Sequence, residues 1–256
     1  MLQLGDQSLW GDEAFTYIVT KSDNWLATLS RDVHPPLYFA LITAWTRIVG
    51  ISEFSFRYPA VLASVVNLAL IYVLARELAR HRPKPAVSVV PLLAVLLLAL
   101  ADLEIQVAQE ARSYTLHLVW LQLSLLSYLR WLRTGKPLWA ISFTLSTALI
   151  VYTHYIGAFT PVAVGVHALL FLRGKQRLQA IAMLVLAAAL FAPWLLAVVL
   201  PQQVGKFAGD VVQAAPSNWQ TLWSFRITWF TQQWPLLLGL AVLGLVSIRY
   251  SAQRWM

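Results

Sequence analysis

The chain has 256 residues, of which 59% are hydrophobic and only 12% are charged, whereas soluble domains are about 45–50% apolar and about 25% charged, so the composition excludes an ordinary water-soluble domain. The net charge of +8 does not indicate nucleic-acid binding, because the basic residues lie in short clusters between apolar runs and not along one face. The absence of cysteine excludes disulfides and thiolate metal sites.

Apolar runs of membrane length recur along the chain and predict an all-α, polytopic helical membrane protein. A helix needs about 20 mostly apolar residues to cross roughly 30 Å of hydrocarbon. About seven segments approach this length, although the last is short and the turn between the fourth and fifth is very tight. They are residues 57–78, 86–107, 114–132, 138–153, 155–172, 178–200 and 235–248.

The region before the first predicted span, residues 1–56, is expected to be an extracytoplasmic loop with interfacial helices. Its apolar stretch at 34–45 is too short to cross a bilayer, and it begins with a proline pair that suits the first turn of a helix. No span precedes this loop, and the chain stops directly after a basic cluster. We therefore expect the sequence to be the N-terminal part of a longer protein.

The distribution of lysine and arginine predicts the topology. Basic clusters follow alternate segments, and such clusters mark cytoplasmic loops. By alternation, the turns at 104–113 and 153–155 face the opposite side. The whole chain, 1–256, is predicted to be a single transmembrane domain that comprises the outer loop 1–56, six spans in 57–200, the outer loop 201–234, and the last span with its cytoplasmic end in 235–256.

Two adjacent carboxylates, Asp12 and Glu13, lie in the first outer loop within residues 9–16, LWGDEAFT. Adjacent side chains on a helix diverge by about 100°, so the two are not expected to have the same role. A carboxylate beside a low-dielectric wall can act as the general base that deprotonates an acceptor hydroxyl or amine. The alternative is a solvated pair that complements the dipole at the start of a helix.

His34 precedes the proline pair Pro35 and Pro36. The prolines restrict the backbone, so the histidine is held on a stiff support, as suits a residue that contacts substrate or metal. An incidental histidine in the turn before a helix fits the same pattern. Both interpretations stay open.

Glu110 and Arg112 lie at the next outer turn, within residues 109–114, QEARSY. Ionisable groups close to the membrane are costly and indicate function by default. Arg112 could bind a phosphate, or Glu110 could simply pair with it.

His154, in the turn 153–155, belongs to the same outer layer of the membrane. Histidines and carboxylates together can hold a divalent cation, and Asp12, Glu110 and His154 are the candidate ligands. Their long-range spacing is unlike any compact metal signature, so whether a metal cofactor takes part stays open.

Taken together, five segments resemble in their order the GT-C membrane glycosyltransferases, in particular the bacterial relatives of dolichyl-phosphate-mannose protein mannosyltransferases, which include the aminoarabinose transferases. The resemblance implies a sugar donor linked to a polyprenyl phosphate, an acceptor that is a lipid, glycan or protein, and a transfer that usually inverts the anomeric carbon. The segments are 9–16 (LWGDEAFT), 32–38 (DVHPPLY), 52–57 (SEFSFR), 109–114 (QEARSY) and 153–155 (THY).

The same resemblance implies roles for individual residues. In such enzymes a carboxylate of the first outer loop is implicated as the base or as an acceptor ligand, and by position this role falls to Asp12. Glu110 matches an acidic residue that assists acceptor or metal binding, while Arg112 and His34 are candidates for binding the donor phosphate or for shaping the cavity. The implied location is the plasma (inner) membrane, with the active face outside the cytoplasm. The implied substrate-binding residues are Glu13, His34, Glu110, Arg112, Tyr114 and His154.

Two other functions compete with a transferase. A transporter or flippase for lipid-linked sugars would have polar residues at mid-membrane, usually near broken helices, whereas here they gather at one outer surface. A non-catalytic membrane subunit or fragment is the second alternative. The predicted partners are otherwise membrane lipids, and no nucleic acid is expected.

Overall fold

A computed structural model describes residues 4–30, 32, 34–80 and 84–202. Every regular element in these ranges is a helix, so the predicted all-α class is confirmed for this part of the chain. The predicted last span at 235–248 and nearly all of the loop 201–234 lie outside the described residues. That residues 1–256 form a single transmembrane domain therefore stays a prediction.

Two of the described helices are long and apolar enough to cross a membrane. They are α4 (Glu53–Ala79) and the helix that begins with α10 (Gly174–Trp194) and continues through a π-helical turn, η2 (Leu195–Val199). Four shorter apolar helices accompany them. The predicted count of seven spans is not confirmed by length and composition.

One segment that the sequence predicts as continuous, 86–107, is divided in the structure. Helix α5 (Lys84–Ala99) ends before the two acidic residues, and α6 (Asp102–Val107) begins after Ala101, whose backbone is extended. Asp102 and Glu104 lie in the first turn of α6, where the dipole favours carboxylates. The acidic residues thus begin a new helix instead of extending the apolar one.

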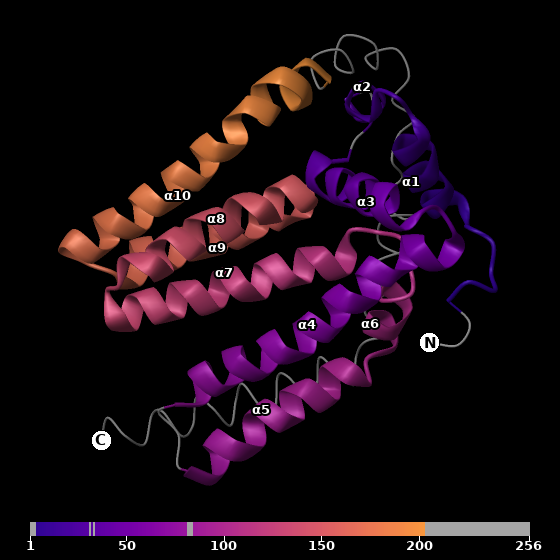
Figure 1. Ribbon diagram of the computed structural model, residues 1–256. Coiled ribbons are helices and arrows are strands. Elements are labelled where there is room, and N and C mark those ends of the chain that lie inside the picture. The colour runs from indigo at the N-terminus through magenta and orange to yellow at the C-terminus, as the bar shows by residue number, and fades with distance from the viewer. Residues whose placement is uncertain (1–3, 31, 33, 81–83, 203–256) are drawn as a thin grey trace, which may run out of the picture. The chain divides into compact units, whose positions relative to one another are not determined.

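The long helices form a layer in which each contacts the next. Helix α4 packs against α5 and against α7 (Tyr114–Thr134), α7 packs against α8 (Pro137–Thr153), and α8 packs against α10 (Figure 1). The tight turn predicted near His154 is a short 3₁₀ helix, η1 (Tyr155–Ala158), which leads into α9 (Phe159–Phe171).

Large apolar side chains cover the outer faces of these helices. Leu92, Leu170 and Leu178 are each more than 60% exposed, and other large apolar side chains along α5, α9 and α10 are more than 40% exposed. Contiguous apolar surface on this scale is unfavourable in water and indicates contact with lipid. The described part of the chain is therefore all-helical and has the surface of a membrane protein.

Three helices from the first loop close one end of this layer. They are α1 (Gly11–Lys21), α2 (Trp25–Leu29) and α3 (Pro36–Val49). Proline at the first position of α3 supplies the helical φ angle where no amide donor is needed, so the predicted interfacial segment is helical.

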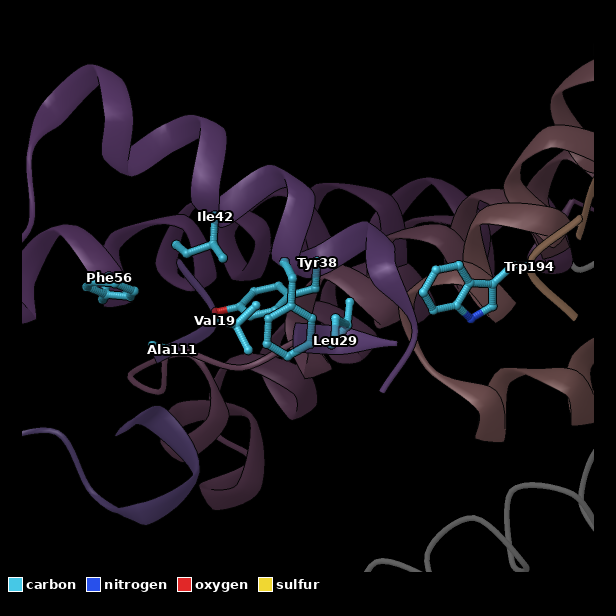
Figure 2. Packing of buried hydrophobic residues seen from close by; sticks show 8 residues of the cluster. Val19, Leu29, Tyr38, Ile42, Phe56, Ala111 and Trp194 are labelled. Atoms are coloured by element: carbon cyan, nitrogen blue, oxygen red, sulfur yellow. The ribbon is translucent and has the colours of Figure 1, made fainter. Parts of the chain in front are cut away.

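A hydrophobic cluster fixes these three helices to the rest of the unit. Side chains from all three belong to one cluster with Phe56 at the start of α4, Ala111 before α7 and Trp194 at the end of α10, and Figure 2 shows these residues. Val19, Leu29 and Phe56 are fully buried. The cluster thus determines where the acidic segment of α1 lies relative to the turn before α7.

Candidate functional site

Asp12 and Glu13 lie in the first turn of α1, and their side chains have opposite surroundings. The Asp12 side chain is 52% exposed, whereas Glu13 is fully buried. Adjacent residues on a helix diverge by about 100°, which allows one carboxylate to face outward while the other faces the interior. Glu13 also accepts a hydrogen bond from the amide of Trp10 (3.3 Å) and so caps its own helix.

The buried Glu13 forms a bidentate ion pair with Arg57 of α4. Arg57 donates from Nε to Oε1 (2.9 Å) and from Nη2 to Oε2 (2.7 Å), and the amide of Ala111 donates to Oε1 (2.8 Å). Burial by itself would raise the pKa of Glu13, but the Arg57 guanidinium and the backbone amides outweigh it and lower the pKa below its usual value. The pair thus joins α1, α4 and the turn before α7.

Arg57 is a residue that sequence reasoning did not select. The sequence nevertheless contains a signal for it, because an arginine near the start of a long apolar helix needs a partner if it is buried. Its remaining donors reach the carbonyl oxygens of Leu4, Gln7 and Ser8, at 2.8 to 3.2 Å. It therefore also holds the chain before α1 in place.

Arg112 lies beside the outward-facing carboxylate. Its Nη2 is 3.5 Å from Oδ2 of Asp12 and 3.1 Å from Nε2 of His34, and its Nη1 donates to the carbonyl oxygen of Asp12 (3.2 Å). Although the guanidinium is buried, its Nε has no hydrogen-bond partner among the described residues. An unsatisfied buried donor is costly, and it is available to a ligand that brings an acceptor.

His34 is oriented by a carboxylate, since its Nδ1 contacts Oδ1 of Asp32. A proton on Nδ1 satisfies that contact and leaves Nε2 to accept from Arg112, as a neutral imidazole does. Asp32 in turn is held through its carbonyl oxygen by Gln202 (2.9 Å), which follows η2. Sequence reasoning missed Gln202, since an isolated glutamine gives no signal.

Tyr114 and His154 extend the cluster. The Tyr114 ring lies 5.9 Å from the guanidinium carbon of Arg112 and 6.0 Å from the His154 ring. Burial lowers the pKa of His154, and the positive charge of the nearby Arg112 guanidinium lowers it further. The structure thus places five of the predicted site residues around one point: Asp12, His34, Arg112, Tyr114 and His154.

Glu110 is not part of this cluster. It accepts a hydrogen bond from Gln106 (3.0 Å) and lines a different cavity, together with Glu13 and Arg57. In the part of the chain that the structure describes, no three His, Asp or Glu side chains are grouped as metal ligands. Among the described residues, the candidate metal ligands Asp12, Glu110 and His154 do not converge on one point.

An apolar pocket of about 190 Å³ reaches the buried side of Arg112. Two more of its lining residues, Tyr38 and Thr115, have a hydroxyl without a hydrogen-bond partner among the described residues. The rest of its wall is formed by hydrophobic side chains, namely Leu41, Ile42, Trp45, Pro59, Ala60, Leu62 and Leu116. Such a pocket fits a ligand that has a polar head and an apolar chain.

One family of known proteins matches the chain. Residues 33–197 match the model of the dolichyl-phosphate-mannose-protein mannosyltransferase family. No curated protein and no solved structure matches the chain. The matched region spans more than half of the sequence and includes His34, Arg57, Glu110, Arg112 and His154. The chain therefore belongs to the dolichyl-phosphate-mannose-protein mannosyltransferase family and is a membrane glycosyltransferase of the GT-C type.

Proposed function

We propose that the protein transfers a sugar from a polyprenyl-phosphate donor to an acceptor hydroxyl or amine at the extracytoplasmic face of the plasma membrane. One observation carries this proposal: the exposed carboxylate of Asp12 lies 3.5 Å from the guanidinium of Arg112, which also lines an apolar pocket. A base, a cation and an apolar wall thus meet at one place. These are the groups that transfer from a lipid-linked sugar requires.

The donor phosphate fits at Arg112. Arg112, Tyr38 and Thr115 all line the pocket, and among the described residues Nε of Arg112 and the hydroxyls of Tyr38 and Thr115 have no hydrogen-bond partner. All three groups can donate hydrogen bonds to phosphate oxygens, and a charged donor strengthens such bonds. The hydrophobic side chains around them accommodate the first units of the polyprenyl chain.

The proposed reaction is a single displacement at the anomeric carbon. Asp12 takes the proton from the acceptor, whose oxygen or nitrogen then forms a bond to the anomeric carbon as the bond from that carbon to the phosphate oxygen breaks. The electron pair leaves with the polyprenyl phosphate, and Arg112 stabilises the negative charge that develops there. Attack from the side opposite the leaving group inverts the configuration.

The neutral His34 keeps Arg112 available for this role. It accepts a hydrogen bond from Nη2 without adding a charge that would compete with the phosphate. Asp32 fixes the orientation of the imidazole through Nδ1. Both residues are therefore positioning residues in the proposed mechanism.

Substitution of the base tests the proposal. We expect Asp12→Asn to reduce sugar transfer roughly 100-fold or more, because a general base typically contributes about 10² to 10⁴. Membranes that contain the protein are incubated with radiolabelled polyprenyl-phosphate sugars, and labelled product and released polyprenyl phosphate are measured. Asp23→Asn, an exposed acidic residue of the same loop, is the matched control. Retained transfer by a correctly inserted Asp12→Asn variant would reject Asp12 as the base.

A further inference from the structure

A second and larger cavity lies next to the catalytic cluster and has no role in the proposed displacement. It encloses about 450 Å³ between the chain before α1, the first turn of α1 and the end of α6. Small-molecule sites typically have volumes of roughly 300 to 1,000 Å³. Neither Asp12 nor Arg112 lines it. Because Arg112 is the proposed partner of the donor phosphate, this cavity is expected to hold another ligand group.

The charged groups on its wall neutralise each other. Glu13 and Arg57 both line the cavity, but the carboxylate and the guanidinium pair with each other and with backbone groups. Glu110 adds one carboxylate, which is half-buried. With no unpaired cation among its described lining residues, this cavity disfavours a phosphate or another anion.

Three glutamine side chains, Gln7, Gln106 and Gln109, also line the cavity, and all three are exposed. Gln106 donates from Nε2 to Glu110 (3.0 Å), and Gln109 donates from Nε2 to the carbonyl oxygen of Ile105 (2.9 Å). Neither amide oxygen receives a hydrogen bond from the described residues. Amides and carboxylates match hydroxyl groups, each of which both donates and accepts.

Trp10 gives the cavity an aromatic surface, and its side chain is 49% exposed. Exposure of an indole is unfavourable in water, so a partner that covers its face stabilises it. The C–H face of a sugar ring can pack on an indole while its hydroxyl groups reach the surrounding amides. The combination of one indole, three amides and the carboxylate of Glu110 fits a saccharide.

We propose that this saccharide cavity, defined by Gln7, Trp10, Gln106, Gln109 and Glu110, binds a non-acidic sugar unit of the acceptor. This inference rests on the proposed transferase function, and it specifies the acceptor as a glycan or a glycosylated molecule. Glu13 on its wall directly follows Asp12 in the chain. A sugar unit held here leaves the neighbouring unit of the acceptor to reach the base.

Binding of simple glycosides to the full chain in lipid nanodiscs tests the proposal. The probes are methyl α-mannopyranoside and methyl β-glucopyranoside, and binding is followed by saturation-transfer difference NMR. Removal of a stacking or hydrogen-bonding partner should weaken binding roughly two- to tenfold. We therefore expect weaker binding by Trp10→Ala and Gln109→Ala, and near-normal binding by Trp10→Phe.

Gln176→Ala is the matched control for Gln109→Ala. Gln176 is also exposed, and it also donates from Nε2 to a backbone carbonyl, that of Leu132 (3.3 Å). This variant should bind the glycosides as the unsubstituted protein does. No binding by the unsubstituted protein, or equal binding by every variant, would overturn the proposal.

Competition distinguishes the acceptor sugar from the donor sugar. Polyprenyl phosphate and polyprenyl-phosphate mannose should leave glycoside binding unchanged, because the donor occupies the Arg112 pocket. Displacement by the mannosylated lipid alone would assign the cavity to the donor sugar and overturn the acceptor assignment. Glycoside binding and the transfer activity of Asp12→Asn are separate measurements, so a failure of the saccharide cavity can be distinguished from a failure of the proposed function.

Discussion

Single residues determine how the two carboxylates of α1 differ. Asp12 is half-exposed beside Arg112, whereas Glu13 is sealed against Arg57. A buried carboxylate that is fully paired has little capacity to take a proton from a substrate, because its charged form is already stabilised. Glu13 is thus suited to hold the site together, and Asp12 is suited to react.

Neutralisation of the buried carboxylate should destabilise the fold. We expect Glu13→Gln to lower the free energy of unfolding by about 3 kcal/mol or more, because it leaves the buried Arg57 without a counter-charge. The measurement is urea unfolding in detergent micelles, followed by circular dichroism. Asp23→Asn, which replaces an exposed carboxylate, should change this free energy by less than about 0.5 kcal/mol. Equal stability of the two variants would contradict a structural role for the pair.

The same substitution should alter the response to acid. The pKa of Glu13 is lower in the folded protein than the ordinary value of 4.5, so its stabilising contribution is complete above that pH and is lost as the pH falls through the folded value. The unsubstituted protein should therefore lose more stability below pH 4.5 than Glu13→Gln does.

The residues of the site differ in how well the sequence predicts their positions. Residue type and membrane side were sufficient to select Asp12, His34 and Arg112, which the structure brings together. Glu110 lies only two residues before Arg112, yet it lines another cavity, because the backbone turns there with the amide of Arg112 bonded to the carbonyl of Glu110 (2.8 Å). A turn of this kind sets side-chain directions that spacing alone does not predict.

Among the elements, helices with a clear physical signal were predicted within a few residues. The proline pair predicted the start of α3, and the apolar length of its segment predicted α4. Helix α7 begins at Tyr114, as predicted. The break between α5 and α6 was missed because hydropathy continues through it. Glu104 nevertheless lies in contact with α4, where the hydroxyl of Ser64 donates to it (2.9 Å). The hydropathy of a segment does not reveal such contacts between helices.

The element η1 depends on a glycine. A methyl group at Gly157 would clash with the side chain of Ile150 and lie 2.8 Å from Cε1 of His117. We expect Gly157→Ala to displace the turn that carries His154, and so to lower thermal stability and sugar transfer together. The clash involves a fully buried isoleucine, so overpacking should cost roughly 1 to 3 kcal/mol.

The control for this substitution is Gly165→Ala in α9. An added methyl group there meets only Leu184, at an ordinary contact distance of 3.6 Å. Because alanine favours helix more than glycine does, this variant should be as stable as the unsubstituted protein or slightly more stable. Thermal unfolding of both variants, with transfer assays, checks the pair. Normal stability of Gly157→Ala would show that the turn tolerates a side chain.

In the described unit, clusters of charged side chains lie at both ends of α7. At the end of α7 near the site lie Arg112 and its partners, and at the other end Glu77 contacts Arg130 and Arg133. Helix α7 has 21 residues and thus spans about 31 Å, close to the roughly 30 Å of a hydrocarbon core. Its buried polar residues, including Gln122 and Ser124, face neighbouring helices and reduce its hydropathy without preventing a membrane location.

This arrangement predicts which side each end occupies. The chain has no cysteine, so Asp23→Cys and Lys136→Cys each carry a single thiol, and both positions are exposed. The basic end should be cytoplasmic, which places the site outside. A membrane-impermeant maleimide applied to intact cells should therefore label Asp23→Cys and leave Lys136→Cys unlabelled.

Permeabilised cells provide the control for this experiment, because both variants should then react to the same extent. The reverse pattern in intact cells would place Asp12 and Arg112 in the cytoplasm, and a lipid-linked donor would have to be used there. Labelling of Asp23→Cys alone would instead mean that the sugar is transferred only after its lipid carrier has brought it across the membrane. The orientation of one helix, α7, thus decides on which side the acceptor must be sought.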